Sequence, residues 1–121
     1  MKSQYIGVRH KGGRCKLNDH LALTETTYYI LLSLYTPQHG YGIMQQTRQL
    51  SGGRIHLAPG TLYGALSALC EKGWIVLLPG GEGERKKEYR LTEKGLSVLK
   101  NEVLRLRQLV ENGNLILGEE L

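Results

Sequence analysis

The segment that most constrains the fold of this chain is residues 74–95, where two strand-like runs lead directly into a helix start. WIVLLP at 74–79 and RKKEYRL at 85–91 are separated by GGEGE, a turn-forming sequence. Tyr89 and Leu91 alternate with charged residues, so both can face a core. Thr92 is a suitable N-cap for the helix that follows. A hairpin with one basic strand, set between helices, is typical of a DNA-binding wing.

Two helices are expected in the first half of the chain. Thr24 can cap the first, which runs to about residue 34 with apolar positions Tyr28, Leu31, Leu32 and Tyr35. Tyr29, Ile30 and Leu34 widen this stripe, so the helix should be largely buried. TPQHG at 36–40 should break this helix, and a second one is expected over 42–50, ended by SGG. Residues 54–56 fit a very short strand or an extended link.

A third helix is expected from Pro59 to about residue 73, because proline suits the first helical position and glycine stops a helix. Its inner stripe, at helical spacing, is Leu62, Leu66 and Leu69. The outer face then presents Thr61, Gly64, Ser67 and Ala68, with Tyr63 at the edge. Their hydroxyl groups suit bases or phosphates, and the small residues permit close approach to DNA. The alternative is that small residues only make this helix easy to pack.

The last helix carries an apolar residue at alternating spacings of three and four, which is a heptad seam. The seam residues are Leu96, Leu99, Val103, Leu106 and Val110. Such a seam on an end helix favours a homodimer, and the alternative is packing on the first helix of the same chain. Asn112-Gly113 is expected to cap or bend this helix.

The order helix, helix, short strand, helix, strand, strand, helix predicts a mostly α fold with a small β-hairpin. It is a winged helix-turn-helix plus a C-terminal dimerisation helix, in which the third helix enters the major groove. We assign residues 1–20 to a basic, flexible N-terminal arm and residues 21–91 to the winged-helix DNA-binding domain. Residues 92–121 form the dimerisation helix and a tail.

The charge distribution favours a polyanionic partner. The net charge is +5, and residues 85–107 carry eight Lys and Arg against three acids. The wing contributes the phosphate-neutralising set Arg85, Lys86, Lys87 and Arg90. Because Glu82 and Glu84 occupy the expected tip, the base of the wing should touch DNA. The outer face of the third helix has no Arg, Asn or Gln, so further contacts are left to Gln45, Gln46, Arg48, the wing or DNA shape.

Other classes of function lack support in the sequence. The four histidines are scattered without an HExxH motif, and no GK[ST] follows the glycine pairs, so we expect no enzyme, metal or cofactor. The two cysteines form no CxxC motif, and Cys70 fits a small buried hydrophobe. No run of 18 apolar residues and no apolar leader occurs, which predicts a cytoplasmic protein with no membrane contact.

Several motifs together resemble the PadR family of bacterial transcriptional regulators. In chain order these are LTETTYYILLSL, HGYGIM, APGTLYGALSAL, KGWI and RKKEYRLTEKG. The resemblance implies a homodimer that represses a nearby promoter by binding a palindromic operator in double-stranded DNA. In many members a small phenolic or drug-like ligand relieves repression. It also implies a packing role for Tyr41, a phosphate contact for Tyr63, and a core role for Tyr89.

This chain differs from the PadR family in two respects, and two other functions are possible for a chain with this sequence. Some drug-binding members stack ligands on a tryptophan of the last helix, whereas the only tryptophan here, Trp74, begins a wing strand. The basic arm is also longer than expected. One alternative is a winged helix used only as a protein-interaction module. The other is a redox or ligand switch that acts through Cys15 or the dimer cavity without direct operator reading.

Overall fold

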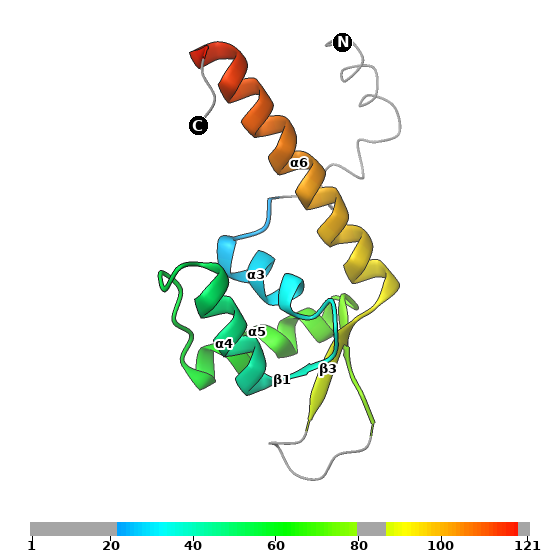
Figure 1. Cartoon of the computed structure of the whole chain (residues 1–121). Coiled ribbons are helices and arrows are strands. Elements are labelled where there is room, and N and C mark those ends of the chain that lie inside the picture. The colour runs from blue at the N-terminus through cyan, green and yellow to red at the C-terminus, as the bar shows by residue number, and fades with distance from the viewer. Residues whose placement is uncertain (1–21, 80–86, 119–121) are drawn as a thin grey trace.

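The computed structural model describes residues 22–79 and 87–118, and the described chain forms four helices and a small antiparallel sheet. In chain order, with the labels of Figure 1, these are α3 (Glu25–Ser33), β1 (Gln38–His39), α4 (Gly40–Leu50), α5 (Pro59–Glu71), β2 (Ile75–Leu77), β3 (Glu88–Leu91) and α6 (Glu93–Leu117). The expected arm at 1–20, the turn at 80–84, Arg85 and Lys86 lie outside the described residues. The mostly helical fold with a β-hairpin is confirmed.

Helices α3, α4 and α5 form a compact body, from which the β2–β3 hairpin and the C-terminal part of α6 project in different directions (Figure 1). The strand order is β1-β3-β2, with Gln38 opposite Tyr89 and Val76 opposite Arg90. The central strand β3 therefore joins the hairpin to the connection between α3 and α4. This is the arrangement of a winged helix.

The predicted caps are present. The Thr24 hydroxyl accepts a hydrogen bond from the Thr27 N–H at 3.1 Å, and the Thr92 hydroxyl accepts one from the Gly95 N–H at 3.0 Å. Each bond satisfies a backbone donor that the first turn of a helix leaves unpaired. Thr92 also donates to the Gly73 carbonyl at 2.6 Å, which fixes the start of α6 beside the end of α5.

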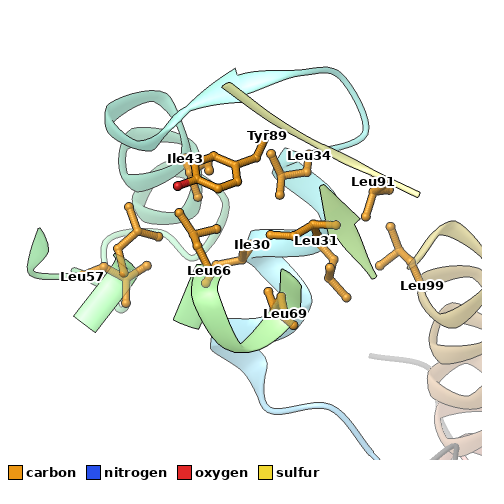
Figure 2. Close-up of a cluster of buried hydrophobic side chains, with 12 residues drawn as sticks. Ile30, Leu31, Leu34, Ile43, Leu57, Leu66, Leu69, Tyr89, Leu91 and Leu99 are labelled. Carbon is orange, nitrogen blue, oxygen red and sulfur yellow. The ribbon is translucent and has the colours of Figure 1, made fainter. Parts of the chain in front are cut away.

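One buried apolar cluster holds the body together, as Figure 2 shows. Every helix and the strands β2 and β3 contribute to it, and its members are Ile30, Leu31, Leu34, Ile43, Leu57, Leu62, Leu66, Leu69, Ile75, Tyr89, Leu91 and Leu99. The inward stripe predicted for the third helix is confirmed, as is the inward orientation of Tyr89 and Leu91. In Figure 2, Leu91 and Leu99 lie close together between β3 and α6.

The connections differ from the sequence-based expectation in one place. Residues 54–56 form no strand, which leaves the extended link of the two alternatives, but Gln38 and His39, within the expected helix breaker, pair with β3. The two residues of β1 form a strand because they pair with β3, some 50 residues further along the chain. Such pairing needs no local alternation of apolar and polar residues, so the sequence did not predict β1.

Two helices also differ from their expected form. In α3 the buried residues are Ile30, Leu31 and Ser33, followed by the buried C-cap Leu34, whereas Tyr35 is exposed. Helix α6 does not end at Asn112-Gly113 but continues to Leu117, where Gly118 adopts a left-handed conformation with φ of 73°. The long helix therefore extends well past the body.

Candidate nucleic-acid interface

The outer face of α5 is the first part of the candidate interface. Because Leu62, Leu66 and Leu69 are held in the core, the intervening positions Thr61, Gly64, Ser67 and Ala68 are exposed, as predicted. Gly64 has open space around it, since a Cβ there would meet no described atom within 4 Å. The face therefore combines hydroxyl groups with a surface on which another molecule can approach the backbone closely.

Tyr63 ties α5 to the start of α4. Its side chain is half-buried, and its hydroxyl lies so close to Gly40 that a Cβ at that position would overlap it. Gly40 directly follows β1, whose His39 is paired with Glu88 of β3. The N-terminal half of α5, the start of α4 and the base of the wing therefore adjoin one another.

The base of the wing carries charges of both signs. Arg90 is exposed on β3, and its guanidinium donates a hydrogen bond to the Leu91 carbonyl at 2.8 Å. Lys87 is half-buried where β3 begins, and His39 Nε2 lies 3.7 Å from Glu88 Oε2 beside it. Arg85 and Lys86, also predicted as DNA contacts, fall outside the described residues.

The two glutamines proposed as further contacts on α4 have different surroundings. Gln46 accepts a hydrogen bond from Gln38 Nε2, which also donates to the Ser33 carbonyl at 3.0 Å. This network joins α3, β1 and α4, so Gln46 serves the fold. Gln45 is exposed, and its Nε2 donates to the Tyr41 hydroxyl at 3.3 Å.

Tyr41 does not have the packing role that the resemblance implied. Its side chain is 67% exposed on the first turn of α4. It points away from the core because Gly40, Ile43 and Thr47 occupy the inner face of this helix. The sequence signal was available, since Tyr41, Gln45 and Arg48 share the face opposite Ile43 at helical spacing.

Helix α6 divides into two parts. Leu99 is only 4% exposed in the core of its own chain, and Leu96 packs against that core. Val103 and Leu106 are half-buried. Beyond them the helix exposes a series of large apolar side chains, which are Leu109, Val110, Leu115, Ile116 and Leu117. Leu104, before Leu106, is exposed as well. The first part of the predicted seam thus belongs to the body, and the second part is exposed.

A buried carboxylate fixes the direction in which α6 leaves the body, and sequence reasoning missed it. Glu102 is only 5% exposed. Its Oε2 accepts a hydrogen bond from the Leu23 N–H at 3.2 Å. The Arg105 guanidinium donates to both carboxylate oxygens, at 2.9 and 2.6 Å. These bonds, that to Arg105 foremost, hold the pKa of Glu102 below its usual value against the opposing effect of burial. A charged pair at i and i+3 on a helix is usually solvated, so nothing in the sequence indicated that Glu102 is buried.

The family comparison decides the class of protein. A model described as the transcriptional regulator PadR-like family matches residues 29–101, which is more than half of the chain. The chain belongs to the PadR-like family. The matched region runs from α3 into the first turns of α6, so it contains α4, α5 and the wing.

Solved structures give the same fold for this PadR-like chain. A transcriptional regulator from Clostridium thermocellum is 24% identical over 75% of this chain and 89% of its own, with a TM-score of 0.60. Bacillus subtilis PadR, in a structure with operator DNA, is 24% identical over 65% of this chain and 46% of its own, with a TM-score of 0.52. Bordetella bronchiseptica BpsR, in a structure concerning regulation of DNA binding by 6-hydroxynicotinic acid, is 14% identical over 83% and 74%, with a TM-score of 0.61. A search of the curated proteins found no match.

Three further observations concern thiol chemistry, metal binding and membrane spans in the described part of this PadR-like chain. Cys70 is half-buried against the core, and burial raises the pKa of its thiol, which disfavours the reactive thiolate. Among residues 22–79 and 87–118, no three His, Cys, Asp or Glu side chains come together to hold a metal ion. None of the helices described is long and apolar enough to cross a membrane.

Proposed function

We propose that this PadR-like chain is a homodimeric repressor that binds a palindromic operator in double-stranded DNA. The observation that carries the proposal is the adjacency of three elements: the exposed face of α5, the start of α4 and the base of the wing. Tyr63 joins the first two through Gly40, and β1 joins the second to the third by pairing with β3. One surface thus presents a recognition helix with its flanking wing.

In this proposal α5 lies in the major groove with Thr61, Gly64 and Ser67 toward the bases and Tyr63 toward a phosphate. Lys87 and Arg90, with Arg85 and Lys86, neutralise phosphates flanking the groove. The face of α5 carries none of the side chains that read guanine or adenine with two hydrogen bonds. Sequence preference therefore rests on hydroxyl and methyl contacts and on the shape of the DNA.

The homodimer is proposed to form through the second part of α6. The exposed apolar side chains on the projecting part of α6 are expected to be covered by a second surface, because monomeric soluble proteins rarely expose large contiguous apolar patches. A second copy of α6 supplies a matching face by symmetry. This proposal divides the chain into three segments: an arm at residues 1–20, a DNA-binding domain at residues 21–91, and a dimerisation segment at residues 92–121.

A small effector that relieves repression is also proposed, from the family resemblance and from the regulation of BpsR named above. Helix α6 carries no aromatic residue, and Trp74 lies half-buried beside Lys72, whose Nζ is 5.2 Å from its ring centroid. An effector at the dimer interface would therefore contact aliphatic side chains rather than stack on an indole. Action on chromosomal DNA places the protein in the cytoplasm.

The proposal is tested by selecting DNA from a random pool with the purified chain and then measuring affinity for the selected and scrambled sequences. We expect an inverted repeat, bound at least a thousandfold more tightly than the scrambled duplex. Ser67→Glu should abolish this preference, because it places a charge against DNA on an exposed position. Its unfolding transition should match that of the wild type. A wild-type protein that enriches no sequence would refute operator binding and favour the protein-interaction module.

A further inference from the structure

The first two turns of α4 carry a pair of polar side chains that the fold does not use. Tyr41 is exposed, and Gln45 one turn later donates a hydrogen bond to the Tyr41 hydroxyl at 3.3 Å. Neither side chain contributes to the core, whereas Gln46 beside them is bound to Gln38. The Tyr41 oxygen accepts this hydrogen bond, so the Tyr41 O–H group can still donate one to another molecule. The bond from Gln45 also limits the directions in which that O–H group can point.

The position of this pair is fixed by its neighbours. Tyr41 follows Gly40, against which the Tyr63 hydroxyl lies, and comes two residues after His39 at the base of the wing. Both Tyr63 and the wing base belong to the proposed DNA interface. Tyr41 and Gln45 therefore lie where the recognition helix and the wing meet.

We propose that Tyr41 and Gln45 together bind one backbone phosphate of the operator as a neutral clamp. The Tyr41 hydroxyl accepts from one Gln45 N–H and donates its proton to a phosphate oxygen. The second Gln45 N–H donates to the same phosphate group. This inference rests on the proposed DNA-binding function. It adds Tyr41 as a DNA contact and gives Gln45, a candidate contact from the sequence, a specific ligand and partner.

Phosphate is favoured over a base edge as the ligand of this pair. In a helix-turn-helix the first helix crosses the backbone while the second occupies the groove. About half to two thirds of protein–DNA hydrogen bonds go to phosphate and sugar, and tyrosine and glutamine are among the usual donors. A contact of this kind positions the protein without selecting a base.

The neutrality of the clamp gives it a distinctive signature. The dependence of affinity on salt reports the number of phosphates neutralised by Lys and Arg, because only these contacts release counterions. Removing a neutral donor should lower affinity without changing the slope of log K against log salt. Removing Arg90 should change both.

The test compares Tyr41→Phe and Gln45→Ala with the matched pair Tyr35→Phe and Gln49→Ala. Tyr35 and Gln49 are also exposed, but Tyr35 lies where the chain leaves α3, near the α6 end of β3, and Gln49 lies in the last turn of α4. Affinity for the operator selected by the wild type is measured at several salt concentrations, and the selection is repeated with each variant.

We expect Tyr41→Phe and Gln45→Ala each to weaken binding roughly tenfold, with an unchanged salt slope and an unchanged selected sequence. The control pair should bind as the wild type does. Wild-type affinity for both variants would overturn the clamp, and an altered selected sequence would show that the pair reads bases instead. Because the wild type defines the operator first, either result is distinct from a failure of DNA binding itself.

Discussion

At two residues, Thr47 and Gly95, the immediate surroundings predict how a substitution changes the stability of the fold. Thr47 lies fully buried on the inner face of α4, and its hydroxyl has no hydrogen-bond partner among the described residues. A buried polar group without a partner destabilises a protein by about 1–3 kcal/mol. Threonine is nearly the shape of valine, so the hydroxyl can be replaced without opening a cavity.

Thr47→Val should therefore raise the free energy of unfolding by about 1 kcal/mol, measured by urea denaturation. Thr47→Ala serves as the control, because it removes the same hydroxyl but also a methyl group and should lower stability. A loss of stability in the valine variant would mean that the hydroxyl is satisfied in solution.

Gly95 allows the first turn of α6 to pack against the backbone of Trp74, the residue before β2. A Cβ at this position would overlap the Trp74 carbonyl, a backbone group that cannot move aside cheaply. Gly95→Ala should lower the free energy of unfolding by more than about 2 kcal/mol. Gly64→Ala, also in a helix but with open space around it, should be neutral or stabilising, because alanine favours a helix by about 1 kcal/mol. Equal stability of the two variants in thermal unfolding would contradict this close contact.

Among the elements, α6 depends on the Glu102 carboxylate for its attachment to the segment before α3. The pKa of Glu102 is lowered in the folded chain, chiefly by the hydrogen bonds from Arg105. The folded state is therefore stabilised above the unfolded pKa of about 4.3, and this stabilisation is lost as pH falls through the lowered folded pKa.

Glu102→Gln should lower stability at pH 7 by about 1–3 kcal/mol, and the difference from the wild type should shrink as pH falls below about 4. Denaturant titrations of both proteins between pH 3 and pH 7 check this. A constant difference across that range would show that the carboxylate charge does not contribute.

The two parts of α6 should respond differently to a buried charge. Leu106→Glu and Val110→Glu are expected to give folded monomers, since both positions lie on the proposed dimer face. Leu99→Glu is expected to unfold the body, because Leu99 is in its core and an unpaired buried charge there costs several kcal/mol. Leu104 is exposed but is not a residue of the predicted heptad seam, so Leu104→Glu is the control that should remain dimeric. Sedimentation and circular dichroism separate these outcomes, and dimeric Val110→Glu would place the interface elsewhere.

For the whole molecule, the sequence predicted those parts of the fold that have a local pattern. The caps at Thr24 and Thr92, the stripe of α5 and the hairpin strands follow from spacing and turn residues. The strand β1 could not be predicted, since two residues show no alternation and owe their form to β3. In α3, seven apolar positions in succession from Tyr28 to Tyr35, interrupted only by Ser33, left its buried face undetermined.

The candidate site was predictable to a similar degree. The outward face of α5 followed directly from the positions of its leucines. The packing role that the family resemblance implied for Tyr41 was wrong, although helical spacing already placed Tyr41 opposite Ile43. The end of α6 was placed too early, because an Asn-Gly pair usually ends a helix, whereas the apolar residues that follow it continue this one.

Two copies of the chain are proposed to bind one operator through α5 and the wing. The most direct test of this proposal is a titration of the selected duplex with the wild-type chain, with the half-site duplex and a scrambled duplex measured alongside. A dimeric operator-binding protein should saturate at two chains per duplex, bind the half-site much more weakly, and show a linear fall of log K with log salt. Equal affinity for the selected and scrambled duplexes at about 0.15 M salt would contradict this proposal.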